Sequence, residues 1–137
     1  MKILVIDGQG GQLGALLIKE LQARITGHEL MAVGTNSVAT AAMLKAGAKQ
    51  AATGENPVVV ACRTADVIVG PIGIVIADSL LGEVTPKMAK AVGQANAERI
   101  LIPMNRCGNV VVGVAEDTVS GMVQRAMEQL EKVLAEG

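Results

Sequence analysis

The sequence predicts a three-layer α/β fold, with a doubly wound, mostly parallel sheet covered by helices on both faces. Segments rich in Val and Ile alternate with segments of helical spacing along the 137 residues. The apolar segments are nearly continuous, which is typical of strands buried on both faces of a parallel sheet. Because crossovers between parallel strands are right-handed, the helices fall on both sides of the sheet. The pattern therefore indicates a Rossmann-like fold.

The composition is that of a single domain over residues 1–137. Half of the residues are apolar and Gly is frequent at 16, but Phe, Tyr and Trp are absent. A chain of this length buries roughly two-thirds of its unfolded surface in one core. Without aromatic rings the protein has no stacking partner for a flavin or an adenine, and no tyrosine to serve as a proton donor.

The charge pattern argues against two classes of partner. The formal net charge is −1, with 12 basic and 13 acidic residues interspersed and no basic run. Nucleic acid is therefore not an expected partner. Uncharged stretches such as residues 67–77 are shorter than the roughly 20 residues that span a bilayer, so no membrane is expected either. Two cysteines without metal-ligand spacing are typical of a reducing, cytoplasmic location.

The first half of the chain begins with a short apolar strand that runs directly into a glycine-rich loop. Leucines recur at helical spacing after the loop, and Thr26-Gly27 ends that pattern. Residues 34–37 form a turn with capping side chains, and Gly47 ends the helix that follows. The predicted elements are strands at 2–6 and 29–33, a weaker strand at 48–53, and helices at 13–25 and 38–46.

Two prolines mark helix starts in the second half. Thr85 before Pro86 has the form of a cap followed by a first helical residue, and so does Asn56 before Pro57. Residues 58–60 are all valine, however, and suit a strand equally well. The predicted elements are helices at 57–63, 86–95 and 117–135, strands at 66–70 and 99–104, and an apolar segment at 74–81.

A sixth strand is predicted at residues 110–114. Only residues 105–109 separate it from the strand at 99–104. A parallel return needs a crossover of about a dozen residues, so the two strands are expected to pair in antiparallel fashion. The sheet is therefore predicted to be mostly parallel with an antiparallel edge strand.

The glycine-rich loop after the first strand is the principal site candidate. Gly8, Gly11 and Gly14 recur at every third position, a spacing that resembles the loop of extended short-chain reductases and sugar-nucleotide epimerases. Free N–H groups at the start of the next helix suit a phosphate. Alternatively, the glycines only permit tight packing of strand against helix. The residues expected to hold phosphate are Gly8, Gln9, Gly10, Gly11 and Gln12.

The expected ligand is a nucleotide, with NAD or NADP favoured. Thr35 and Asn36 follow the second strand and can meet a ribose, although such residues also cap helices. The acidic residue that usually binds the ribose at this point is missing, and no arginine stands nearby for a 2′-phosphate. Asp7 would repel a pyrophosphate, so it either orients loop amides, coordinates a cation or indicates different chemistry.

A second glycine turn provides the next candidate. Gly70, Pro71 and Ile72 follow a buried strand at the expected cleft edge, where doubly wound sheets commonly contact a central ribose or phosphate. The apolar segment at 74–81 beside it is either fully buried or a contact between subunits.

No catalytic residue can be assigned from the sequence. His28 precedes the second strand, at the amino edge of the sheet, and Cys107 has no histidine in reach as a base. Gln9 stands where aspartyl phosphatases need a second aspartate, and no Walker lysine follows the glycines. No metal site is expected. Six further polar residues of the chain are candidate contributors to the site, although a surface or capping role explains each of them better than catalysis: Glu55, Asp78, Glu83, Lys87, Asn105 and Arg106.

Several segments together resemble a bacterial family of about this length. They lie at residues 6–11, 34–36, 52–56, 69–74, 81–86 and 102–105, with Cys107. The family is known only as a domain of unknown function with a Rossmann-like sheet, so the resemblance implies a fold and little about activity.

Two functional hypotheses follow. In the first, the protein is a cytoplasmic nucleotide-binding protein; an oxidoreductase of this size would need another subunit to complete its substrate pocket, so a homo-oligomer is expected. In the second, it is a ligand-sensing or scaffold module that acts through a homo-oligomer interface and needs no acid–base residue. The sequence leaves open whether the protein is an enzyme.

Overall fold

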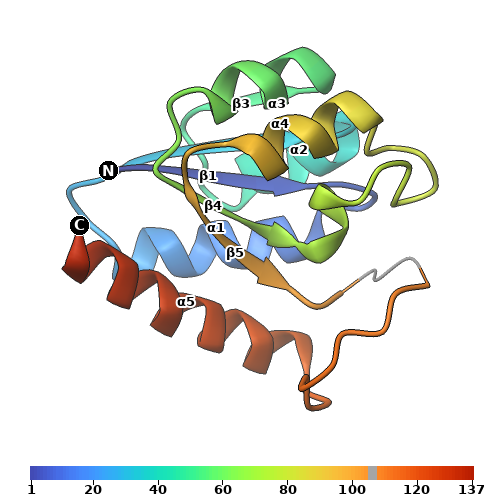
Figure 1. The fold of residues 1–137 in the computed structure, drawn as a ribbon. Helices are drawn as coiled ribbons and strands as arrows, with labels where there is room; N and C mark the ends of the chain where they lie inside the picture. Colours follow the sequence, from blue (N-terminus) through green and yellow to red (C-terminus); the bar gives the residue numbers. More distant parts are fainter. Residues whose placement is uncertain (105–107) are drawn as a thin grey trace.

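The computed structural model describes residues 1–104 and 108–137, which form a five-stranded parallel sheet in the order β3-β2-β1-β4-β5. Every strand pair is parallel. The strands, shown in Figure 1, are β1 (Lys2–Asp7), β2 (Glu29–Gly34), β3 (Ala51–Thr53), β4 (Val67–Pro71) and β5 (Glu98–Ile102).

Helices cover both faces of this sheet, so the three-layer, doubly wound architecture is confirmed. Figure 1 shows α1 and α5 on one side of the strands and α3 and α4 on the other; α2 packs beside α1. The helices are α1 (Gln12–Arg24), α2 (Ser37–Lys45), α3 (Glu55–Cys62), the 3₁₀ turn η1 (Ile72–Val75), α4 (Pro86–Gln94) and α5 (Val119–Glu136).

The core consists of two apolar clusters, one on each face. Ile3 and Val5 of β1 belong to the cluster under α1 and α5, whereas Leu4 and Ile6 belong to the cluster under α3 and α4. Successive side chains of a strand point to opposite faces, so a continuous apolar strand supplies both clusters. Each such side chain contributes about 1.5–3 kcal/mol on burial. The core is therefore built without a single aromatic ring.

The strand order reverses at β1, which lies between β2 and β4. The register pairs Asp7 with Gly34, the last residues of β1 and β2. In doubly wound sheets, ligands bind outside the carboxyl ends of the strands at this reversal point. The loop after β1 is thus in the position that the fold reserves for a ligand.

Of the two helix starts predicted from a cap followed by proline, one agrees with the structure and one does not. Thr85 caps α4 as expected, because its Oγ1 accepts a hydrogen bond from Met88 N at 3.1 Å. The helix expected at 57–63 exists, which excludes a strand there, but it begins at Glu55. Gly54 is its N-cap residue and no side chain caps it, so the assignment of Asn56 as the cap is wrong.

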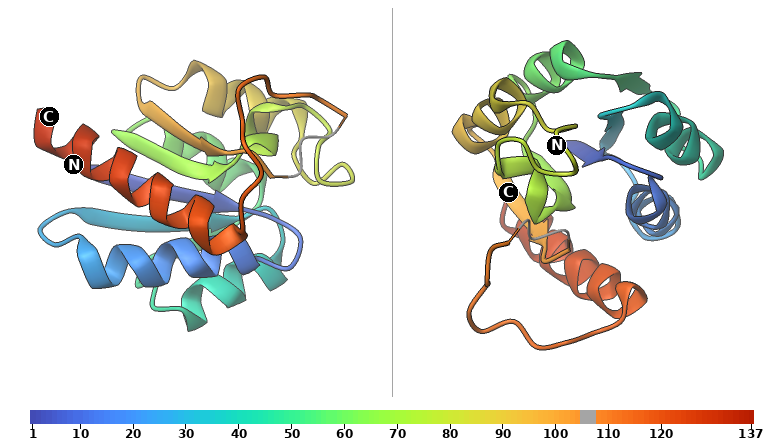
Figure 2. Two further views of the ribbon diagram at one scale, coloured as in Figure 1. Left: turned by 90° about the horizontal axis from the view of Figure 1, so that it is seen from below. Right: turned by 90° about the vertical axis from the view of Figure 1, so that its right-hand side faces the viewer.

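The predicted antiparallel edge strand at 110–114 is wrong. Residues 110–114 form no strand, and Gly113 has a φ of 85°, which turns the chain away from an extended path. The valine run that predicted a strand is largely exposed, with Val110 at 86% and Val112 at 93%. Figure 2 shows the segment projecting as a long loop, which leaves β5 as the edge strand of the described sheet.

Within the described residues, no helix is both long enough and apolar enough to cross a lipid bilayer.

Candidate functional site

The loop after β1 makes a tight turn before it enters α1. Gly11 N donates to Gly8 O at 3.0 Å, and both Gln9 (φ 51°) and Gly11 (φ 73°) adopt the left-handed conformation. Gly11 is the N-cap residue of α1 and offers no side chain to the helix start. The first amides of α1 therefore face whatever lies beside the loop.

Some of these amides are already satisfied within the chain. Gly14 N donates to Asp7 Oδ2 at 2.6 Å, and Gln9 N donates to Glu83 Oε1 at 2.8 Å. Across residues 1–104 and 108–137, no hydrogen bond is formed by the amides of Gly10, Gln12 and Leu13. Three donors at the start of α1 are thus available to a ligand.

A cavity of about 330 Å³ lies beside these donors. This volume is at the lower end of the range of roughly 300–1,000 Å³ that is typical of small-molecule sites. The cavity is lined by Asp7, Gly8, Gln9, Gly10, Gly11, Gln12, Leu13 and Met104. All five residues predicted to hold phosphate therefore line one cavity.

Asp7 orients the glycine loop. Its side chain is buried and accepts a hydrogen bond from Gly14 N, which supports the first of the three interpretations of this residue. Burial raises the pKa of Asp7, hydrogen bonds from Gly14 and Gly8 oppose that effect, and the nearby Glu83 carboxylate raises the pKa further. Among the residues that the structure describes, no cluster of His, Cys, Asp or Glu is suited to a metal ion.

The reason why a glycine occupies each position differs along the loop. A Cβ on Gly8 would lie 2.5 Å from Thr35 Oγ1, and one on Gly14 would lie 2.7 Å from Met43 Sδ. These two glycines are explained by packing alone. A Cβ on Gly10 would meet nothing within 4 Å, so the fold itself does not require a glycine at this position.

Thr35 and Asn36 converge on Glu83, which from the sequence is only one of six candidate polar contributors. Glu83 Oε1 accepts hydrogen bonds from Thr35 Oγ1 at 2.7 Å and Asn36 Nδ2 at 2.6 Å, in addition to that from Gln9 N. Asn36 Oδ1 also accepts from Ala39 N at 2.9 Å, so Asn36 caps α2. The capping role of Asn36 is confirmed, and its contact with a ribose stays a prediction.

The carboxylate of Glu83 is held in its ionised form. Burial raises the pKa of Glu83, but the hydrogen bonds from Gln9, Thr35 and Asn36 lower it, and the net result is a pKa below the ordinary value of 4.5. The sequence placed Glu83 among surface and capping residues. Its separation of 48 residues from Thr35 explains why no local spacing could reveal this contact.

The segment that carries Glu83 is a compact, strained loop after η1. Asp78, Leu80 and Leu81 all have positive φ angles, of 65°, 55° and 57°, and strain of this kind clusters at functional sites. Leu80 is 3% exposed and Leu81 is 96% exposed. The apolar segment expected at 74–81 is therefore neither fully buried nor fully exposed, and its buried part fixes Glu83 beside the glycine loop.

The second glycine turn has a clear role in packing. A Cβ on Gly70 would lie only 2.3 Å from Ile6 O, so Gly70 lets β4 approach β1. The structure does not bring Gly70, Pro71 or Ile72 into the lining of the cavity beside the glycine loop. Their contact with a ligand stays a prediction.

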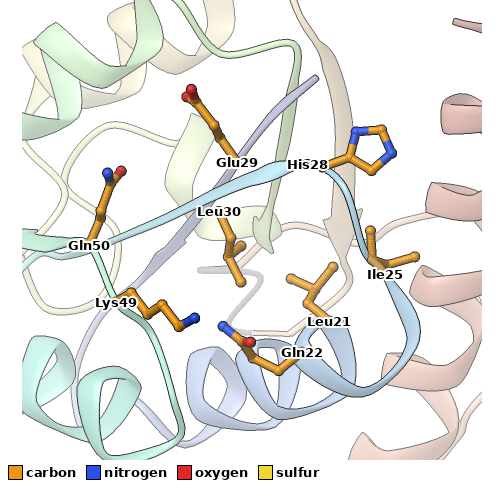
Figure 3. Close-up of a pocket in the computed structure, with 8 residues that line it drawn as sticks. All are labelled: Leu21, Gln22, Ile25, His28, Glu29, Leu30, Lys49 and Gln50. Carbon is orange, nitrogen blue, oxygen red and sulfur yellow. The ribbon is translucent and has the colours of Figure 1, made fainter.

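A second cavity, of about 240 Å³, lies at the opposite end of the sheet, where β2 and β3 begin (Figure 3). His28 is at this amino edge, as expected, and its Nδ1 lies 3.0 Å from the N-terminal amine of Met1. Doubly wound sheets bind ligands at the opposite end, outside the carboxyl ends of the strands. The lining residues are Leu21, Gln22, Ile25, His28, Glu29, Leu30, Lys49 and Gln50.

Cys62, the cysteine within the described residues, is not suited to act as a nucleophile. Cys62 is buried in α3, and burial raises the pKa of its thiol to about 11. Cys107, with Asn105 and Arg106, lies outside the described residues. Glu55 Oε2 accepts a hydrogen bond from Thr85 Oγ1 at 2.6 Å, a contact that joins the starts of α3 and α4.

Comparison with known proteins assigns the chain to a family. The chain is similar to the crystal structure of a dodecameric FMN-dependent UbiX-like decarboxylase from Escherichia coli O157:H7, with a TM-score of 0.47 and 16% identity over 96% of this chain and 95% of that one. No curated protein matches the chain in sequence. A family model described as "Domain of unknown function (DUF3842)" matches residues 2–135, which confirms the resemblance to a small, uncharacterised Rossmann-like family. The chain thus belongs to the family of the domain of unknown function DUF3842.

Proposed function

We propose that the protein binds a nucleotide, with an NAD-like ligand favoured, in the cavity beside the glycine loop. The observation that carries the proposal is the set of unpaired amides of Gly10, Gln12 and Leu13 in the described chain, which open onto that cavity at the start of α1. Backbone N–H groups at a helix N-terminus bind phosphate through hydrogen bonds and the helix dipole. The strand order places the cavity where doubly wound sheets bind ligands.

Gly10 adds a second line of support. Its missing side chain is not explained by packing, because a Cβ there would meet nothing within 4 Å. A side chain at this position would project into open space, and Gly10 is one of the residues that line the cavity. The glycine is thus accounted for by a ligand that approaches the backbone closely.

The ultraviolet spectrum of the purified protein is a direct test. The chain has no Trp, Tyr or Phe, so a co-purified nucleotide would dominate the absorbance. A protein without a nucleotide band, and without a thermal shift in NAD, NADP, ATP, FAD or nucleotide sugars, would contradict the proposal.

A pair of matched variants locates the site. Gly10→Asp adds a negative charge to a residue that lines the cavity and is expected to abolish the thermal shift given by the ligand. Gly93→Asp makes the same change of charge at an exposed position of α4, where a Cβ also meets nothing within 4 Å. This variant should retain the thermal shift. Equal shifts in the two variants would place the ligand elsewhere.

A second candidate function is a sensing or scaffold module that assembles as a homo-oligomer. The exposed valines of segment 108–118 favour it, because Val110 and Val112 are 86% and 93% exposed and β5 is an edge strand of the described sheet. β-branched residues and an unpaired strand edge are what a second copy needs to extend a sheet.

A further inference from the structure

We propose that Glu83 recognises the ribose of the ligand and selects a nucleotide with an unphosphorylated ribose, as in NAD, against one with a 2′-phosphate, as in NADP. The inference rests on the proposed function and adds to it the class of nucleotide that the site accepts. Its basis is the position of one carboxylate relative to the end of β2 and the glycine loop.

The first step is position. Glu83 Oε1 lies within hydrogen-bond distance of Thr35 Oγ1, Asn36 Nδ2 and Gln9 N, at 2.7, 2.6 and 2.8 Å. Thr35 and Asn36 directly follow β2, and Gln9 belongs to the glycine loop after β1. In dinucleotide-binding sheets, the ribose hydroxyls meet an acidic residue at the end of the second strand. The sequence has no acid there, and the structure supplies one from the segment after η1.

The second step is charge. Among the described residues, no lysine or arginine forms an ion pair with Glu83. Its partners are an amide, a hydroxyl and a backbone N–H, which hold the carboxylate in place without cancelling its charge. A 2′-phosphate beside this carboxylate would meet a negative charge that no ion pair among the described residues compensates. Coulomb repulsion at a few ångströms then weakens binding on the order of 100-fold.

The third step is the remaining acceptor capacity. All three of these hydrogen bonds fall on Oε1, and Oε2 has no hydrogen-bond partner within residues 1–104 and 108–137. A carboxylate accepts hydrogen bonds at both oxygens. Oε2 is thus an acceptor for a ribose hydroxyl, while Oε1 stays anchored to the protein.

The competing interpretation is that Glu83 acts as an internal anion that blocks the cleft. It would then have to leave before any nucleotide binds, and its removal would strengthen the binding of NAD and NADP alike. A ribose acceptor gives the opposite result for NAD, so the two roles make different predictions for one variant.

The experiment is a calorimetric titration of the full chain with NAD and with NADP. For the unmodified protein we expect NAD to bind on the order of 100-fold more tightly than NADP. Glu83→Gln should weaken NAD about 10-fold, strengthen NADP and bring the two affinities close together. The matched control is Glu55→Gln, which alters another carboxylate that accepts a threonine hydroxyl, and it should leave both affinities unchanged.

Glu83→Asp provides a further check that keeps the charge if the amide variant does not fold. It should weaken NAD but still exclude NADP. Equal affinities for NAD and NADP in the unmodified protein, or tighter binding of both by Glu83→Gln, would overturn the role of Glu83 and leave nucleotide binding standing. A folded protein that binds neither nucleotide would overturn both proposals.

Discussion

Asp7 Oδ2 and Gly14 N are joined by a buried hydrogen bond of 2.6 Å, so the last residue of β1 caps the first turn of α1. A helix start is usually capped by the side chain of the N-cap residue, but here the N-cap residue is Gly11, which has no side chain. Asp7, at the end of β1, accepts the hydrogen bond in its place. This bond ties the two ends of the glycine loop together, while the amides of Gly10, Gln12 and Leu13 form no hydrogen bond within the described residues.

The stability of the protein should depend on pH through Asp7. Because burial raises its pKa above the ordinary 3.8, the folded state binds this proton more tightly than the unfolded state does. The stabilising effect of the proton is complete below the ordinary pKa and is lost as the pH rises through the folded pKa. Urea unfolding above about pH 4 should show this loss in the unmodified protein and not in Asp7→Asn. Asp66→Asn, which removes an exposed carboxylate bound to Lys2 N, should keep it.

Glu83 should contribute in the opposite direction. Its folded pKa lies below 4.5, so its contribution to stability is present above the ordinary pKa and is lost as the pH falls through the folded value. Glu83→Gln should cost about 1 kcal/mol at neutral pH, since it weakens charge-assisted hydrogen bonds at a partly exposed site. The difference in unfolding free energy between the two proteins should disappear in acid. A difference that stays constant with pH would contradict the role of the ionised carboxylate.

Gly10 and Gly11 should respond differently to alanine. Gly11 has a φ of 73°, and a Cβ there would lie 2.7 Å from Ala39 Cα, so Gly11→Ala should cost about 1–3 kcal/mol in unfolding free energy. Gly10→Ala should change it by less than about 0.5 kcal/mol. Chemical denaturation of the two variants measures the difference. Equal costs would show that the open space beside Gly10 is absent in solution.

The exposed valines should control assembly if the protein forms a homo-oligomer. Replacing Val110 and Val112 by lysine puts charges in place of the exposed valines of segment 108–118, and should convert the oligomer to a monomer in light scattering. Val38→Lys changes a valine on α2 that is 64% exposed and serves as the control. An oligomer that persists in the double variant would place the interface elsewhere.

The parts of the fold that the sequence predicts well are those with a local physical cause. The continuous apolar segments give the strands, and the Thr85-Pro86 pair gives the start of α4, because cap and proline act on adjacent residues. Asn56-Pro57 has the same form, yet α3 begins earlier, at Glu55, since Gly54 supplies the turn. A cap residue followed by proline thus marks the helix start at Thr85, whereas at Asn56 a turn at the preceding Gly54 starts the helix earlier.

The errors concern relations between distant residues. The valines at 110–112 have strong β propensity, but a strand also needs a partner edge in register, and the turn at Gly113 removes it. Glu83 meets Thr35 only because the left-handed loop at Asp78, Leu80 and Leu81 folds back over the glycine loop. Neither relation has a periodic pattern along the chain, so neither could be predicted from one.

The two edges of the sheet differ in length. β3 contains only three residues, whereas β5 contains five, so β3 offers too few backbone groups to recruit another strand. Each molecule therefore offers one strand edge, that of β5, to which the sheet of another copy can pair. If two copies met through β5, they would use up both edges in a closed, two-fold symmetric pair, and assembly of this kind would stop at a dimer instead of continuing into a fibre.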